Sequence, residues 1–228
     1  LAMNDSIQDS GDESILNSFG DEDNSILDKY REDESFFKEI GAAGFRLDEG
    51  FNGSIEAQMT YNPEGLKVEI NASNPGMYVN NIFGNCPDKS KLIACHNFYP
   101  QKYTGLGFNL FKSTSQNLKN LGLPIAAFVG SQEEGTYGPW PVNEGLCTLE
   151  IHRDLPIDAQ ARHLFATGLV DDVIIANAYA SEEELKRLAS VNPGLLTFGI
   201  KLNKETNTLI SLNVSANLLG MSGIATPL

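Results

Sequence analysis

The segment from Cys95 to Pro100 holds the side chains with the clearest potential for ligand binding. It reads CHNFYP and directly follows the apolar run Leu92-Ile93-Ala94. In parallel α/β folds, the carboxyl ends of the strands open onto the ligand-binding face. The pattern therefore predicts that His96, Asn97 and Tyr99 face a substrate. The alternative is that these polar groups cap the helix that follows.

Two carboxylates follow a second short apolar run, at 44–47. Asp48 and Glu49 come directly after this run, and Gly50 allows the backbone to turn sharply. A carboxylate at a strand end can act as general acid, general base or nucleophile when a second carboxylate faces it. The alternative is a helix cap with a salt bridge to Arg46.

The long connection at 137–153 could supply the second carboxylate. Connections in α/β units are usually short, so we expect one of this length to be functional or an insertion. It contains the only Trp of the chain. Its candidates are Trp140 for stacking on a sugar ring, Glu144 or Glu150 for the second carboxylate, and Arg153, next to His152, for clamping an anion. The alternative is that the segment leads into the next helix while the Trp covers one end of the sheet.

These candidates lie in a repeated pattern of strand followed by helix. Short apolar segments predict strands at 44–47, 66–71, 92–97, 125–130 and 172–177. Helical spacing predicts helices at 26–40, 79–84, 109–121, 157–168 and 181–190. In the last of these, Ser181 and the three glutamates after it form a capping box. Strands that alternate with helices predict a parallel sheet with right-handed crossovers.

Every predicted strand ends in polar or small residues. The groups are Asp48 and Glu49; Asn71 and Ser73; His96, Asn97 and Tyr99; Gly130 and Ser131; and Asn177. Polar groups at one edge of a parallel sheet are typical of a barrel rim or of the crevice of an open sheet. A (β/α)8 barrel needs eight strands, and five are recognisable here.

The composition excludes several other functions. The formal net charge of −14 argues against nucleic-acid binding, which needs clustered Lys and Arg. The three cysteines lack CxxC spacing, and the three histidines form no metal motif, so we expect no metal. The chain has no Walker A loop, no GxGxxG and no GxSxG, and we expect no cofactor.

The chain is expected to act in the cytoplasm, without contact to a membrane. It has no apolar stretch of roughly 20 residues and no signal peptide. Residues 1–33 are strongly acidic and predict a disordered or atypical segment. Residues 34–192 form the predicted barrel-like domain. Residues 193–228 predict a short β segment that could begin a truncated second domain.

Two long motifs resemble the bacterial 6-phospho-N-acetylmuramidase family: CHNFYPQKYTGL at 95–106 and EGLCTLEIHR at 144–153. RLDEGF at 46–51, MTYNPEGLKVEINASN at 59–74 and the segment 171–188 extend the resemblance to about 34–190. The resemblance implies a cytoplasmic (β/α)8 TIM barrel with a small β-rich C-terminal domain. It also implies release of 6-phosphomuramic acid from a cell-wall phosphodisaccharide during peptidoglycan recycling. The five strands would then be strands four to eight.

The resemblance also implies roles for the candidate residues. Asp48 and either Glu150 or Glu144 would be the acid/base and nucleophile, in an order that the sequence leaves open. Arg153 or Arg46 would bind the phosphate or the lactyl carboxylate. Asn71, His96, Asn97 and Tyr99 would orient the sugar by hydrogen bonds. The other residues expected to bind the substrate are Glu49, Trp140, His152 and Asn177.

The chain departs from the family pattern in three respects. Nothing in 1–33 resembles the first three βα units, Cys147 replaces a Pro of the family, and Tyr137 replaces an Arg. A five-stranded partial barrel would expose two sheet edges, which could pair in a homo-oligomer. The alternative function is therefore a non-catalytic remnant that binds a phosphosugar or has no activity. Another phosphosugar enzyme, such as an aldolase, is disfavoured because no lysine ends a strand.

Overall fold

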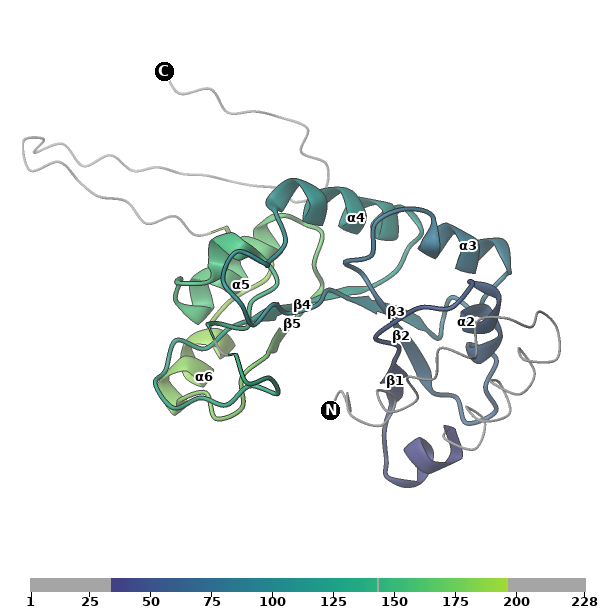
Figure 1. Ribbon diagram of the computed structural model, residues 1–228, viewed down its shortest axis with the longest axis horizontal. Coiled ribbons are helices and arrows are strands. Elements are labelled where there is room, and N and C mark those ends of the chain that lie inside the picture. The colour runs from purple at the N-terminus through teal and green to yellow at the C-terminus, as the bar shows by residue number, and fades with distance from the viewer. Residues whose placement is uncertain (1–33, 143, 197–228) are drawn as a thin grey trace, which may run out of the picture.

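The computed structural model describes residues 34–142 and 144–196. Its sheet has five parallel strands in chain order: β1 (Gly44–Arg46), β2 (Lys67–Asn71), β3 (Leu92–Cys95), β4 (Ile125–Val129) and β5 (Asp172–Ile175). Each strand after β1 pairs in parallel with the strand before it in the sequence, which is the order of a (β/α) barrel. Figure 1 shows the sheet curving as an arc. The predicted α/β class and the partial barrel are confirmed by this curled five-stranded sheet.

The helices lie along the outer side of the arc (Figure 1). They are α2 (Ser54–Met59), α3 (Tyr78–Gly84), α4 (Phe108–Asn120), α5 (Ile157–Ala166) and α6 (Glu182–Ala189), with a 3-10 turn, η2 (Glu150–His152), before α5. The helices predicted at 79–84, 109–121, 157–168 and 181–190 are confirmed within two residues at each end. The Ser181 cap is also present, because its Oγ accepts a hydrogen bond from the Glu184 N–H at 3.2 Å.

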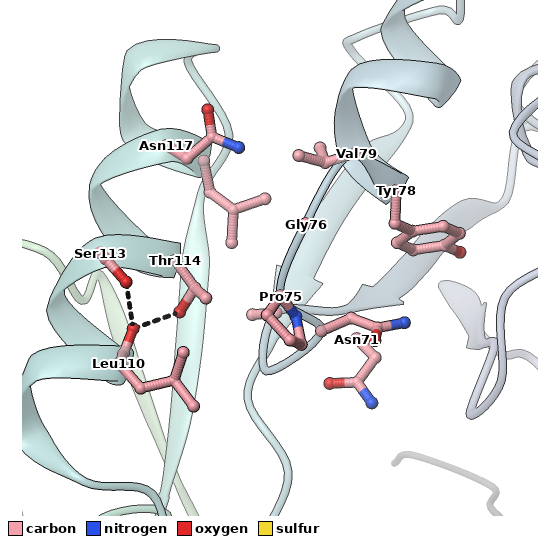
Figure 2. Close-up of a pocket in the computed structure, with 12 residues that line it drawn as sticks. Asn71, Pro75, Gly76, Tyr78, Val79, Leu110, Ser113, Thr114 and Asn117 are labelled. Atoms are coloured by element: carbon pink, nitrogen blue, oxygen red, sulfur yellow. Dashed lines mark hydrogen bonds between the residues drawn. The ribbon is translucent and has the colours of Figure 1, made fainter.

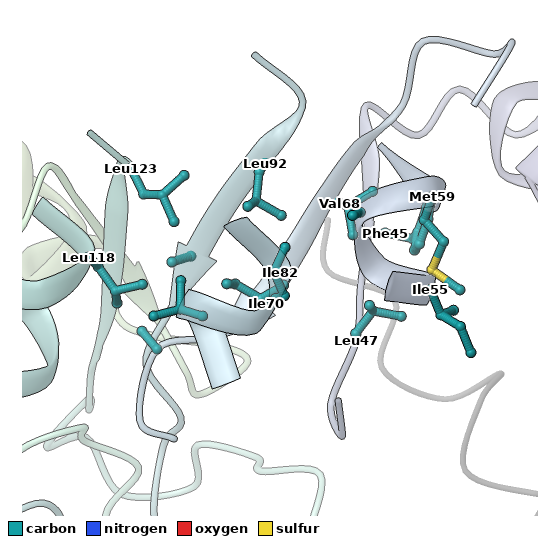
Figure 3. Close-up of a cluster of buried hydrophobic side chains, with 14 of the residues drawn as sticks. Phe45, Leu47, Ile55, Met59, Val68, Ile70, Ile82, Leu92, Leu118 and Leu123 are labelled. Atoms are coloured by element: carbon teal, nitrogen blue, oxygen red, sulfur yellow. The ribbon is translucent and has the colours of Figure 1, made fainter. Parts of the chain in front are cut away.

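Alternation along the strands separates an apolar outer face from a more polar inner face. Val68, Ile70 and Leu92 are fully buried in a cluster that also contains Ile55 of α2 and Ile82 of α3 (Figure 3). Each such side chain stabilises the fold by about 1.5–3 kcal/mol. A second cluster joins β4 and β5 to α4 and α5. The residues between these apolar positions face the inside of the arc.

Helix α2 is absent from the sequence prediction, because its six residues follow a Gly-rich segment that is typical of a loop. Asn52 and Glu56 form its start. Asn52 Oδ1 accepts hydrogen bonds from the N–H groups of Ser54 and Ile55, and the buried Glu56 carboxylate accepts from Phe51 and Gly53. These side chains satisfy the free N–H groups at the helix start. Glu56 therefore has a structural role.

Parts of the sequence prediction lie outside the described residues. The helix predicted at 26–40 is present over 34–39, and the rest of it is not described. The acidic segment 1–33 and the β segment expected in 193–228 also lie outside, apart from residues 193–196. The three domain boundaries therefore stay predictions. No helix within 34–142 or 144–196 combines the length and the apolar character needed to cross a membrane.

The sheet has two edge strands, β1 and β5. Within the described residues, neither strand pairs with another strand on its outer side. Pairing through these edges in a homo-oligomer stays a prediction.

Candidate active site

The carboxyl ends of the five parallel strands lie along one edge of the sheet, here called the rim. Arg46 is the last residue of β1 and connects three strands there. Its guanidinium donates to Glu69 Oε1 at 2.7 Å, to the Cys95 carbonyl oxygen at 3.3 Å and to the Asn97 side-chain oxygen. Arg46 is buried, and the Glu69 side chain is 16% exposed. The inner face of β1 to β3 thus carries an ion pair together with a carboxamide.

Asp48 follows this array at the end of β1. Arg46 pairs with Glu69 in the register, and the Leu47 N–H continues the pairing by donating to the Glu69 carbonyl at 2.8 Å. Because side chains alternate and Leu47 is buried in the core, Asp48 belongs to the same inner face as Arg46. Asp48 is half-buried, and it makes no hydrogen bond or ion pair with any residue in the described ranges. Glu49 beside it is exposed.

His96 is buried below the rim, where its ring lies between the hydroxyl groups of two serines. Its Nδ1 is 3.2 Å from Ser73 Oγ, and its Nε2 is 2.9 Å from Ser115 Oγ on α4. Its ring packs against that of Phe111, with 4.8 Å between centroids. Burial, with a smaller effect of the Arg46 charge, lowers the pKa of His96 to about 3. The ring is therefore neutral and points to α4, so it reaches a ligand only through Ser73.

Ser73 connects the ends of β2 and β3. Its N–H donates to Asn71 Oδ1 at 2.8 Å, and its Oγ accepts from the Asn97 N–H at 3.0 Å. Tyr99 is half-buried nearby in sequence, and burial raises the pKa of its phenol. The structure thus brings together Asn71, Asn97 and Arg46 around the ends of three neighbouring strands.

Glu150 is held by Arg153 and by two backbone groups. Arg153 Nε and Nη2 donate to the two Glu150 oxygens at 2.7 and 2.6 Å. The same oxygens accept from the N–H groups of Tyr103 and Gly105 at 2.9 and 2.8 Å. The hydrogen bonds from Arg153, followed by those from the two N–H groups, lower the pKa of Glu150 to about 2 against the effect of burial. The carboxylate is therefore charged and accepts four hydrogen bonds from three residues of the protein.

The remaining donors of Arg153 are also occupied. Its Nη1 donates to the carbonyl oxygens of Tyr99, Glu144 and Gly145 at 2.9, 3.1 and 3.2 Å. The side chain is 3% exposed. It therefore joins the connection after β3 to the connection after β4, and it leaves no donor pair for the bidentate clamp on an anion that the sequence predicted.

Other predicted site residues lie apart from the Arg46 array. His152 is fully buried with its Nε2 2.8 Å from His163 Nδ1, and burial, with a smaller effect of His163, lowers its pKa to about 3. Asn177 is buried and binds the Ser131 N–H at 2.9 Å. Glu144 and Trp140 are exposed on the connection after β4. The structure therefore joins Arg46 to Asn97 directly and Asn97 to Asn71 through Ser73, with Asp48 two residues after Arg46 in the chain. It gives His152, Asn177, Glu150 and Arg153 partners inside the fold.

Sequence reasoning did not identify Glu69 as part of the site. It placed Ser73 at a strand end but did not predict that Ser73 connects Asn71, His96 and Asn97. Glu69 stands in the middle of the predicted strand, between the apolar Val68 and Ile70. That alternation was the available signal, because a carboxylate between two core residues must face the inside of the sheet.

The N–H groups at the end of β4 are all occupied by protein side chains. Gly130 N–H donates to Gln160, Ser131 N–H to Asn177, and Gln132 N–H to Glu184, at 2.8 to 2.9 Å. Helix α6 also begins with three glutamates. In many barrels, the last two strands and such a helix start bind phosphate. Here the three N–H groups after β4 are occupied, and the glutamates give the start of α6 an unfavourable charge for an anion.

A cleft lies on the outer side, between α3 and α4 (Figure 2). Val79, Ser113 and Asn117 line it, and Asn71 reaches it from the rim. The hydroxyls of Ser113 and Thr114 donate to the carbonyl oxygen of Leu110, one turn earlier in α4. Its volume of about 220 Å³ is below the roughly 300 Å³ at which ligand sites usually begin. None of the described residues that line the cleft is charged, whereas the inner face carries the Arg46–Glu69 ion pair, so the inner rim is the better candidate for chemistry.

Comparisons with known proteins agree with the geometry of a partial barrel. Residues 13–190 match the family model described as 6-phospho-N-acetylmuramidase, N-terminal. A crystal structure of an uncharacterized B. cereus protein is 50% identical, with a TM-score of 0.69 over 76% of this chain and 54% of that one. A conserved Enterococcus faecalis protein of unknown function is 31% identical, with a TM-score of 0.59 over 71% of this chain and 45% of that one.

This chain thus spans about half the length of these solved structures. None of the curated proteins compared with it matches. The resemblance found from the motifs is confirmed by the family match, which covers most of the sequence. The protein therefore belongs to the 6-phospho-N-acetylmuramidase family, whose N-terminal region it matches.

Proposed function

We propose that this protein hydrolyses the glycosidic bond of a cell-wall disaccharide that carries 6-phosphomuramic acid. The observation that carries the proposal is the family match over 13–190. The Arg46–Glu69 ion pair on the inner face, with Asp48 two residues after Arg46, supports it. As the family resemblance implies, we place this reaction in peptidoglycan recycling in the cytoplasm.

The reaction needs two carboxyl groups. One protonates the oxygen of the leaving sugar, and the other attacks the anomeric carbon or removes a proton from the attacking water. We assign one of these two groups to Asp48, because it has no hydrogen bond or ion pair in the described part of the chain. We assign the other to Glu69, which lies on the inner face with the Arg46 guanidinium 2.7 Å away. Glu144, exposed on the connection after β4, is the alternative partner.

Glu150 is a poor candidate for the general acid. A general acid at neutral pH needs a raised pKa, whereas four hydrogen bonds lower that of Glu150 to about 2. The same four hydrogen bonds also occupy both oxygens that a nucleophile would need, so we propose a positioning role for Glu150 in place of the catalytic role expected from the sequence.

The sugar would be oriented by the amides of Asn71 and Asn97, and by Tyr99. The Ser73 N–H holds the Asn71 side chain, and the Ser73 hydroxyl holds the backbone of Asn97. Arg46 donates to the side-chain oxygen of Asn97. His96 is buried below Ser73 and supports it. Side chains held by such contacts bind with a smaller loss of conformational entropy.

The test is turnover of the phosphorylated disaccharide by the full chain, with products identified by mass spectrometry. The unphosphorylated disaccharide is the substrate control. Asp48→Asn and Glu69→Gln should each lower kcat by roughly 100-fold or more. Glu39→Gln, at an exposed carboxylate before β1, is the matched control and should keep the wild-type rate.

Calorimetry with muramic acid 6-phosphate separates the remaining outcomes. Binding without turnover would support the non-catalytic alternative. The absence of both binding and turnover would reject the proposed function.

A further inference from the structure

We infer that residues 101–105, which follow β3, form a fixed platform for the substrate: Tyr103 contacts the sugar, and Lys102 contacts its anionic substituent. Glu150 is then a positioning residue that acts through this platform. The inference rests on the proposed function, since it names how that site would bind its substrate.

Tyr103 combines high exposure with an unusual backbone conformation. It is 91% exposed, and its φ of 68° lies in the left-handed region that bulky residues rarely adopt. Such conformations persist only where the surroundings enforce them, and they are concentrated at functional sites. An exposed aromatic ring gains nothing from the core, so core packing does not explain this conformation.

The enforcing group is the Glu150 carboxylate. It accepts from the Tyr103 N–H at 2.9 Å and from the Gly105 N–H at 2.8 Å. A Cβ on Gly105 would lie only 2.6 Å from Glu150 Oε2 and 2.9 Å from its Cα. A glycine is therefore needed for this close approach.

Further hydrogen bonds fix the rest of the platform. The Lys102 N–H donates to Glu144 Oε2 at 2.9 Å, and the Thr104 hydroxyl donates to the Gln101 carbonyl at 2.6 Å. Arg153 holds Glu150 and binds the Glu144 carbonyl. Glu144 and Glu150, two of the three carboxylates that the sequence proposed for catalysis, thus both bind the backbone of one loop.

Lys102 supplies the positive charge that would bind the anionic substituent of the substrate. At the strand ends and in the connections that follow them, the described residues include three cations, Arg46, Lys102 and Arg153. Arg46 and Arg153 are buried and paired with Glu69 and Glu150. Lys102 is exposed, and its ammonium group has no partner among the described residues. Lysine binds phosphate well as a point charge, and the N–H groups after β4 are already occupied.

Steady-state kinetics on the phosphorylated disaccharide tests the inference. Tyr103→Ala and Glu150→Gln should each raise KM about tenfold and change kcat less than threefold. The double variant should have the KM of Tyr103→Ala alone, because Glu150 acts through Tyr103. Gly105→Ala, which displaces the loop without removing a charge, should reproduce the rise in KM. Tyr61→Ala, an exposed tyrosine between α2 and β2, is the control and should match the wild type.

Lys102→Met should lower the preference for phosphorylated over unphosphorylated disaccharide at least tenfold. Lys112→Met, an exposed lysine on α4, is its control. If Glu150→Gln instead turns over roughly a thousandfold more slowly at unchanged KM, the inference is overturned and Glu150 regains a catalytic role. An unchanged KM in Tyr103→Ala would also overturn it.

Two further measurements keep this inference separate from the proposed function. Amide hydrogen exchange at 102–105 should become faster in Glu150→Gln, even if that variant loses stability elsewhere. If the wild type binds muramic acid 6-phosphate without turnover, only the catalytic proposal fails, and the same variants are compared by Kd. If the wild type shows neither binding nor turnover, both proposals are rejected.

Discussion

The connections after β1 to β3 and those after β4 and β5 use their polar side chains differently. After the first three strands, Asp48 has no partner in the described residues, and the side chains of Asn71 and Asn97 accept hydrogen bonds through their oxygens while their NH2 groups have no acceptor among those residues. After β4, the side chains of Gln160, Asn177 and Glu184 bind three consecutive N–H groups. Polar residues at strand ends are therefore weak evidence for a site by themselves. The distinguishing feature is whether their hydrogen bonds are already made within the protein.

The largest effect is expected in the first region, from Arg46→Met. Removing the guanidinium would leave Glu69 largely buried without its ion pair, which typically costs about 3–5 kcal/mol. Denaturant unfolding measures this loss. Lys119→Met removes the exposed ion pair with Asp171 and should cost less than about 1 kcal/mol. Equal effects of the two variants would show that the inner face is solvated and not a prepared site.

Acid should destabilise both regions through one buried histidine in each. The pKa values of His96 and His152 are about 3 in the fold, below the ordinary value of 6.5. The unfolded chain therefore binds more protons below pH 6.5, and stability decreases as the pH falls, by roughly 1.4 kcal/mol per pH unit for each ring. At pH 5 the expected loss is about 2 kcal/mol per histidine.

Glu150 adds a loss of stability in the same direction but at lower pH. Its pKa is lowered from 4.5 to about 2, so its stabilising contribution is complete above pH 4.5 and is lost as the pH falls from 4.5 to 2. Unfolding free energies at pH 7.5, 5 and 3.5, compared between the wild type and Glu150→Gln, separate the two effects. A flat profile from pH 7.5 to 5 would mean that the histidines are accessible to solvent.

A pair of asparagine variants compares the two regions directly. Asn177→Ala would leave the Ser131 N–H without its partner and should cost about 1–3 kcal/mol of stability, with KM unchanged. Asn97→Ala should raise KM for the phosphorylated disaccharide. Thermal unfolding and steady-state kinetics on both variants measure these effects. A change in KM for Asn177→Ala would return this residue to the substrate site.

The smallest effect is expected from Ser181→Ala at the start of α6. Loss of a helix cap costs about 1 kcal/mol, and here it also removes the hydrogen bond to Glu133. Denaturant unfolding should show this decrease without any change in turnover. A larger loss would mean that α6 supports the connection after β4 more strongly than its cap suggests.

Much of the fold can be predicted because its signals are local. Apolar runs such as 92–97 indicate the strands, and the Ser181 cap indicates the start of α6. Helix α2 cannot be predicted in this way, because it depends on Glu56 turning back to bind Phe51 and Gly53. The family itself is also recognisable, since its motifs are contiguous in the sequence.

The candidate site is only partly predictable, because a residue type does not specify its partner. The motif EGLCTLEIHR is identified from the sequence, but the roles of its Glu150 and Arg153 depend on each other and on a loop 45 to 47 residues earlier. Glu69 lies within a predicted strand, and its ion pair with Arg46 spans 23 residues.

The amino-acid sequence alone predicts the alternation of strands and helices, because these elements depend on interactions between residues close together in the chain. The polar strand ends and the family motifs are also recognisable from the sequence, because each is a contiguous segment. The tertiary structure was needed to show which polar groups on the inside of the arc lack a hydrogen-bond partner among the described residues and which bind other parts of the protein. Burial and hydrogen bonding act between segments that are distant in the chain, and no local pattern encodes their outcome. They make Glu150 a charged support for the loop at Tyr103 and leave Asp48 as the candidate for chemistry.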